Sequence, residues 1–161
     1  LLMVITACAV AFAHGSNDVN NAIGPFAGIT EANESSTTAE VEEDSYTIPI
    51  WIFIFGGLGI VVGIVTYGHR IIKTVGKKIT PLSYSRGFAA QISAALVVLL
   101  ATFRGLPIST THCVIGAVTG VGLVDSKDAI NIKILKKIVV TWVVTFPAAA
   151  LLGILVYMVF Q

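Results

Sequence analysis

The chain has 161 residues, of which 55% are hydrophobic and only 12% are charged. A typical soluble domain carries about 25% charged residues, so this composition excludes an ordinary water-soluble protein and indicates that lipid surrounds most of the chain. The formal net charge of +1 supplies no field for a polyanion, which excludes nucleic acid as a partner. Cys8 and Cys113 lie in apolar runs and indicate no metal site.

The hydrophobic runs predict an all-α integral membrane protein with several passes, because about 20 mostly apolar residues cross a bilayer as a helix. The first run is already apolar at Leu1, so we expect the sequence to be a piece of a longer protein. The predicted elements, in chain order, are a transmembrane helix over 1–29 that is broken at Gly24-Pro25, an acidic external loop over 30–47, a transmembrane helix over 48–68, a basic cytoplasmic loop over 69–86, a pair of short apolar segments over 87–124, a second basic cytoplasmic loop over 125–137, and a transmembrane helix over 138–161 that continues past Pro147.

The pair of segments over 87–124 has two interpretations, two full spans or a re-entrant helical hairpin that enters and leaves on one side. Arg104 and Pro107 interrupt it near its middle. Under either interpretation the two basic loops lie on the same side, and the positive-inside rule places that side in the cytoplasm. The acidic loop then faces outward, and its composition is typical of a disordered linker.

A polar stripe follows the first apolar run. On a helix, His14, Asn17, Asp18 and Asn21 share one face, because their spacing follows the i, i+3, i+4 rule. A carboxylate near the bilayer centre costs about 2.5–3.5 kcal/mol on insertion scales, and a bound cation would offset that cost. Asp18 supplies the charge, and the amide oxygens of Asn17 and Asn21 complete a shell of hard oxygen ligands. The structural alternative is a polar cluster that joins helices, but so many polar groups in one turn and a half favour a cation site.

A second polar cluster, residues 105–112, predicts an anion site. Pro107 suits the first turn of a helix, where its missing N–H costs nothing. Ser109, Thr110 and Thr111 then lie beside unpaired N–H groups at the helix N-terminus, which carries about half a positive charge. This arrangement suits an oxyanion such as phosphate or sulfate, and a plain N-cap is the structural alternative. Secondary transporters hold cations and anions at interrupted helices near the midplane, so the two clusters together predict anion uptake coupled to sodium or protons.

These two clusters resemble the two signatures of the inorganic phosphate transporter (PiT) family. Residues 13–25, AHGSNDVNNAIGP, are similar to its G-A-N-D-V-A-N-A signature, and residues 105–112, GLPISTTH, are similar to its G-x-P-x-S-T-T-H segment. The likeness covers nearly all of the chain and is greatest to the C-terminal half of the sodium–phosphate symporters. Asn20 and Ser16 depart from the usual residues, and Asn20 puts the ion preference in question.

The resemblance implies a fold and a function. The family has two inverted repeats with the substrate between them, and this chain contains one, so we expect the N-terminal half of the same transporter as a partner. A homodimer is one possible assembly, and the sequence leaves the oligomeric state open. It favours the re-entrant hairpin, and it implies inorganic phosphate symport with sodium, by alternating access, across the plasma membrane, with no cofactor besides the sodium ion as co-substrate. Carried across residue by residue, sodium is held by Asp18, Asn17 and Asn21, and phosphate by Ser109, Thr110, Thr111, Asn17 and Asn21.

Three further residues are candidate accessory groups. His14 and His112 are expected to form hydrogen bonds, with a proton relay as the alternative, and Arg104 either attracts phosphate or extends to the membrane interface.

Among other functions, proton-coupled sulfate or phosphate transport is the alternative closest to the prediction. An intramembrane hydrolase with Ser109 as nucleophile leaves Asp18 unexplained, and a receptor without transport activity predicts that Asp18→Asn has no effect.

Overall fold

The structure is a computed structural model that describes residues 1–37, 48–125 and 130–160. These residues are helical apart from short links, and no strand occurs among them, which confirms the all-α class. The elements are α1 (Leu2–Thr37), α2 (Ile50–Gly63), α3 (His69–Thr74), α4 (Tyr84–Phe103), α5 (Thr110–Asp125) and α6 (Ile132–Phe160), with π-helical segments η1 (Ile64–Gly68) and η2 (Val75–Ile79) on either side of α3. Residues 30–37 of the acidic loop predicted over 30–47 belong to α1, so that part of the prediction is wrong, and residues 38–47 lie outside the described residues.

Helix α1 is continuous where the sequence predicted a break. It runs from Leu2 to Thr37 with Pro25 inside it, although a proline in a helix interior costs about 3 kcal/mol through its lost hydrogen bond. Residues before and after Pro25 pack against α2. Ile23 is buried and lies against Gly56, and the ring of Phe26 meets the ring of Trp51 edge-on, with centroids 5.7 Å apart. Packing therefore keeps the helix intact across Pro25.

The segment after α2 is also helical where a loop was predicted. From Ile50 to Ile79 the chain forms one helical run, with helical backbone angles at Ile64, His69 and Val75, where its segments meet. The predicted basic loop over 69–86 is therefore wrong as a loop, and only residues 80–83 link this run to α4. Long basic side chains can extend from a helix to water, so their presence did not require a loop.

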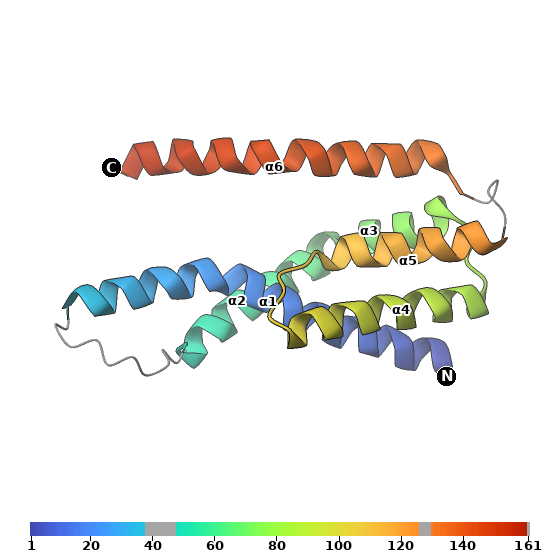
Figure 1. Cartoon of the computed structure of the whole chain (residues 1–161), viewed down its shortest axis with the longest axis horizontal. Helices are drawn as coiled ribbons and strands as arrows, with labels where there is room; N and C mark the ends of the chain where they lie inside the picture. Colours follow the sequence, from blue (N-terminus) through green and yellow to red (C-terminus); the bar gives the residue numbers. More distant parts are fainter. Residues whose placement is uncertain (38–47, 126–129, 161) are drawn as a thin grey trace.

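Helices α4 and α5 form a hairpin that extends only to the middle of α1. At its open end, Gly87 of α4 lies against Met3, Thr6 donates to Gln91, and Arg86 pairs with Asp125 at the end of α5. At its tip, the carbonyl of Ile108 meets Asn17, halfway along α1. The chain thus enters beside the start of α1, turns at its midpoint and returns (Figure 1). Because α4 alone is long enough to cross a membrane, the choice between a re-entrant hairpin and two full spans stays a prediction. Gly105, at φ +67°, makes this turn in a conformation that side chains disfavour.

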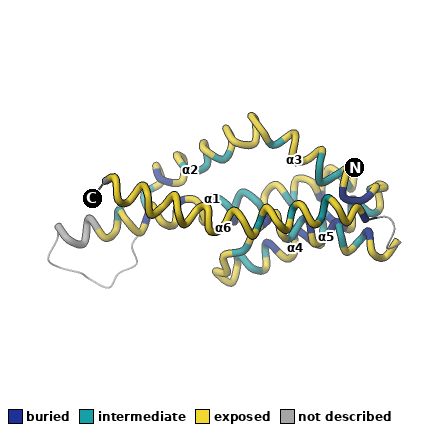
Figure 2. Tube along the Cα trace, turned by 90° about the horizontal axis from the view of Figure 1, so that it is seen from above, coloured by how far each residue is buried: buried dark blue, intermediate teal, exposed yellow. Residues whose placement is uncertain are grey.

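Four helical stretches are long and apolar enough to cross a membrane: Leu2–Ala32, Ile50–Ile79, Tyr84–Phe103 and Ile132–Val159. The buried core lies between the hairpin and η2, at Ile79, Ala90, Ile115 and Val118. Helix α6 is mostly exposed (Figure 2), as expected of a helix that faces lipid or another part of a membrane protein.

Helix α6 begins at Ile132, so Lys133, Lys136 and Lys137 lie in its first turns and not in the loop predicted over 125–137. It continues past Pro147 as predicted. Its first residues, the end of η2 and the open end of the hairpin gather at the end of the molecule where the chain begins (Figure 1). The two basic segments therefore lie at the same end, and its assignment to the cytoplasm stays a prediction.

The contact between α1 and α2 gives a test of the fold. A Cβ on Gly56 would lie 2.3 Å from the Cγ2 atom of Ile23, whereas a Cβ on Gly57 meets nothing within 4 Å. We expect Gly56→Ala to lower the stability of the full-length protein in detergent by about 1–3 kcal/mol, because the helices must separate. Gly57→Ala is the matched control, with an unchanged or higher Tm. Equal melting temperatures for the two variants would contradict this packing.

Candidate functional site

The predicted polar stripe of α1 faces the hairpin tip. Asn17 is buried, and its Nδ2 atom donates to the carbonyl of Ile108 at 2.9 Å and to Oδ1 of Asp18 at 3.0 Å. Its Oδ1 atom accepts from the hydroxyl of Thr102 at 3.4 Å. Asn21, one turn further on, donates to the same Ile108 carbonyl at 3.4 Å. The two amides therefore fasten the tip of the hairpin to the middle of α1.

Asp18 lies at the centre of this contact. The hydroxyl of Thr110 is 3.1 Å from each of its carboxylate oxygens, and Nε2 of His14 is 2.5 Å from Oδ2. Its side chain is 30% exposed, so it keeps an open side toward the pocket described below. A carboxylate that faces one hydroxyl, one amide and one imidazole retains free lone pairs for a cation.

The hairpin tip presents the first turn of α5. The hydroxyl of Ser109 accepts from the N–H of His112 at 3.3 Å, and its carbonyl accepts from the N–H of Cys113 at 3.1 Å, so Ser109 is the N-cap of α5. The N–H groups of Thr110 and Thr111 have no partner within the helix. Hydroxyls and free N–H groups therefore lie together at the positive end of a helix, which is a favourable place for an anion.

A pocket of about 600 Å³ brings most of the predicted site residues together. It is lined by polar groups of both clusters and by an apolar wall that includes α2: Asp18, Asn21, Ala22, Ile60, Pro107, Ile108, Ser109, Thr110 and Thr111. No Lys or Arg is among these lining residues, which all belong to the described part of the chain. The pocket thus offers one carboxylate for a cation and a helix N-terminus with hydroxyls for an anion, side by side.

The remaining predicted residues lie elsewhere. Asn17 lies behind Asp18 and does not line the pocket. His14 contacts Asp18 but lines a second, mainly apolar cavity of about 880 Å³, which reaches Tyr84 at the start of α4 and shares only Thr110 and Thr111 with the first. Arg104 is exposed at the end of α4.

His112 faces away from Asp18. Its ring stacks on that of Trp142 in α6, with centroids 3.6 Å apart. The hydroxyl of Ser109 accepts from the backbone N–H of His112, so the structure does not pair Ser109 with the imidazole of His112, which with His14 was one of the two bases of the hydrolase alternative.

Sequence reasoning missed three contributors to the site. Thr102 holds the buried amide of Asn17, the carbonyl of Ile108 receives both amides, and Ile60 closes one wall. Thr102 and Ile60 lie in apolar runs without a polar pattern, and a backbone carbonyl carries no sequence signal. Only a fold-level model that placed the tip against Asn17 could have found them.

A hairpin that turns beside a polar stripe at mid-helix, among helices of membrane-spanning length, defines a multi-pass integral membrane protein. The sequence model of the phosphate transporter family matches residues 1–153, and the chain belongs to this family. That result confirms the resemblance noted from the two signatures.

Individual relatives agree with the family. A Pyrococcus abyssi protein named "putative phosphate permease" is 50% identical over 157 residues, which are 97% of this chain and 38% of that protein. Sodium-dependent phosphate transporter 1 of Xenopus tropicalis is 42% identical over 99% of this chain and 23% of its own length. A solved structure of a sodium-dependent phosphate transporter matches with a TM-score of 0.75 and 44% identity, over 90% of this chain and 35% of that one. The chain therefore spans well under half the length of these relatives.

Proposed function

We propose that this chain is one half of a sodium-coupled inorganic phosphate symporter of the plasma membrane, which works by alternating access. Sodium binds at Asp18 with amide oxygens of Asn17 and Asn21, and phosphate binds at the hydroxyls and N–H groups of residues 109–111. The N-terminal half of the same transporter supplies the rest of the site. Membership of the family and the sodium-dependent relatives support this proposal.

The contact between Asp18 and Thr110 is the observation that carries the proposal. The hydroxyl of Thr110 lies 3.1 Å from both oxygens of the carboxylate, so the predicted cation ligand touches the predicted anion site. A phosphate anion at residues 109–111 meets like-charge repulsion from a bare Asp18 carboxylate. A sodium ion on Asp18 removes that repulsion and adds an attraction. Phosphate then binds well only after sodium, which is the thermodynamic requirement of coupled transport.

The absence of Lys and Arg from the lining of the described pocket fits the same scheme. A fixed cation would bind phosphate whether sodium were present or not, and would weaken the dependence on sodium. In the half of the site that this chain supplies, the positive charge comes from the transported ion and from the partial charge of the helix N-terminus. Release of sodium therefore weakens phosphate binding at the same moment.

The test is radiolabelled phosphate uptake by the full-length protein in proteoliposomes, under an inward sodium gradient or with choline in its place. We expect uptake that needs sodium and is not reduced by excess sulfate. Uptake that survives in choline and rises as external pH falls would instead assign proton coupling. Competition by sulfate would assign a less selective oxyanion permease, and no uptake by folded protein under any gradient would overturn the phosphate assignment.

A further inference from the structure

Helix α6 touches the rest of the described chain along one stripe that ends at the level of the hairpin tip. Ile134, Leu135, Ile138 and Trp142 pack against the core between the hairpin and η2. Beyond Trp142, every residue from 143 to 159 is exposed. Trp142 is therefore the last residue of α6 among residues 132–159 that is not exposed.

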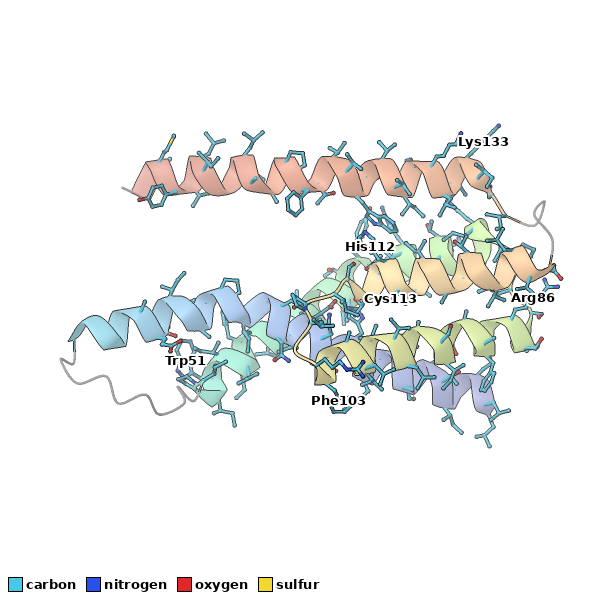
Figure 3. All side chains as sticks on the ribbon, in the orientation of Figure 1. Trp51, Arg86, Phe103, His112, Cys113 and Lys133 are labelled. Carbon is cyan, nitrogen blue, oxygen red and sulfur yellow. The ribbon has the colours of Figure 1, made fainter. Side chains whose placement is uncertain are left out.

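The partner of Trp142 in this contact is His112. The two rings stack with centroids 3.6 Å apart and planes 29° apart, and Figure 3 shows His112 extending from α5 into the space below α6. On an α-helix, residues two positions apart point in nearly opposite directions, about 200° around the axis. Thr110 therefore faces α1, while His112 faces α6. The start of α5 is held from two opposite sides.

The two sides hold the tip by different means. On the α1 side, the contacts use the site's own polar groups: Asn17 and Asn21 with the Ile108 carbonyl, and Asp18 with Thr110. In the proposed function the cation and the anion bind to these same groups, so ligand binding can change their hydrogen bonds. On the α6 side, the contact is a ring stack whose two members do not line that pocket. The stack can therefore persist while the polar contacts exchange.

We propose that Trp142 is a positioning residue, which acts through His112 to keep residues 109–111 in the geometry that binds phosphate. This inference rests on the proposed function. His112 also donates its N–H to the N-cap hydroxyl of Ser109, so the stacked ring belongs to the residue that closes the first turn of α5. An aromatic stack of this kind accounts for roughly a 2- to 10-fold change in a binding constant.

The test is phosphate uptake by the full-length protein in proteoliposomes as a function of phosphate concentration. We expect Trp142→Ala to raise the KM for phosphate roughly 2- to 10-fold while the maximal rate stays within about twofold of wild type. Trp142→Phe keeps an aromatic partner and restores most of the affinity. Phe146→Ala is the matched control, because Phe146 lies one turn further along α6 and is 85% exposed. His112→Ala should raise KM as much as Trp142→Ala, and the double variant should be no worse than either.

A second measurement follows the contact itself. The emission of Trp142, obtained as the difference between wild type and Trp142→Phe, should shift when His112 is replaced by Ala, because the indole loses its stacked ring. An unchanged emission, additive effects of the two alanine variants, or a KM equal to that of Phe146→Ala would each overturn the inference. A fall in maximal rate with an unaltered KM would also overturn it. Wild-type uptake reports separately on the proposed function, so failure of the two ideas is distinguishable.

Discussion

Asp18→Asn is expected to reduce sodium-dependent phosphate uptake by about 100-fold or more. The amide has the size of the carboxylate and can still accept hydrogen bonds from Thr110 and Asn17, which contact the native carboxylate at 3.1 Å and 3.0 Å. The charge is lost, and the oxygen that faces Nε2 of His14 becomes an NH2 group. Removing one member of a close, partly buried charge pair costs about 2–5 kcal/mol, and here the missing interaction is the one with the bound cation. Under the proposed function phosphate binding depends on that cation, so we expect phosphate uptake to be lost with it.

Glu31→Gln is the matched control. It removes a carboxylate from the same helix, and Glu31 is exposed and does not line either cavity at the hairpin tip. Uptake by the two variants would be compared in proteoliposomes at equal protein content, with a sodium gradient and with choline. Near-normal sodium-dependent uptake by Asp18→Asn would remove Asp18 from the transport mechanism and support a structural role for the polar stripe.

Thr110→Val is expected to lower uptake at subsaturating phosphate by roughly 10- to 100-fold. Thr110 is only 6% exposed, and valine nearly matches its shape, so the change removes a hydroxyl and little packing. The hydroxyl is the one donor that joins the hairpin tip to the carboxylate of Asp18. A hydrogen bond to a charged group contributes about 1.5–3 kcal/mol, and its loss both frees the tip and leaves the carboxylate less well held.

Helix α5 offers a close control for this variant. Thr119 is also partly buried in α5, but its hydroxyl has no hydrogen-bond partner in the described chain, so Thr119→Val should leave uptake unchanged and stability equal or higher. Thr110→Ser keeps the hydroxyl and should retain most of the activity. If Thr110→Val and Thr119→Val behaved alike, the contact between Thr110 and Asp18 would have no part in transport.

The sequence predicted which polar residues lie together at the hairpin tip better than it predicted the boundaries of the helices. The spacing of Asn17, Asp18 and Asn21 places them on one helical face whatever the tertiary structure, and the two amides do meet the hairpin there. The re-entrant interpretation of residues 87–124 followed only from the family resemblance, because a short apolar pair can equally span twice, and the position of the tip against α1 was not predicted. Helix geometry alone places His112 on the opposite side of α5 from Thr110, because the two are two residues apart. Its stacking partner Trp142 belongs to a helix distant in the sequence, so that contact could not be predicted.

The wrong boundaries have a common physical cause. Gly24-Pro25 is a local signal for a helix break, and the basic segment over residues 69–79 is a local signal for a loop. In water-soluble proteins such signals often determine where a helix ends. In this fold, contacts of Ile23 and Phe26 with α2 outweigh the proline, and the buried Ile79 holds the end of the basic segment in the core. Local propensity is a weak guide where a neighbouring helix supplies the packing.

The unbroken α1 also determines what kind of motion the site can undergo. A helix of 36 residues is about 54 Å long at 1.5 Å per residue, whereas the hydrocarbon core is about 30 Å thick. Even with a strong tilt, one end projects beyond the core. Asp18 lies about 24 Å along this helix from Leu2. A tilt of α1 about its first turns therefore changes the membrane depth of Asn17, Asp18 and Asn21 together. The spacing of their backbone atoms stays fixed. Under the proposed function, α1 therefore carries the three proposed cation ligands as one rigid unit, and alternating access requires a change in the contact between α1 and the hairpin.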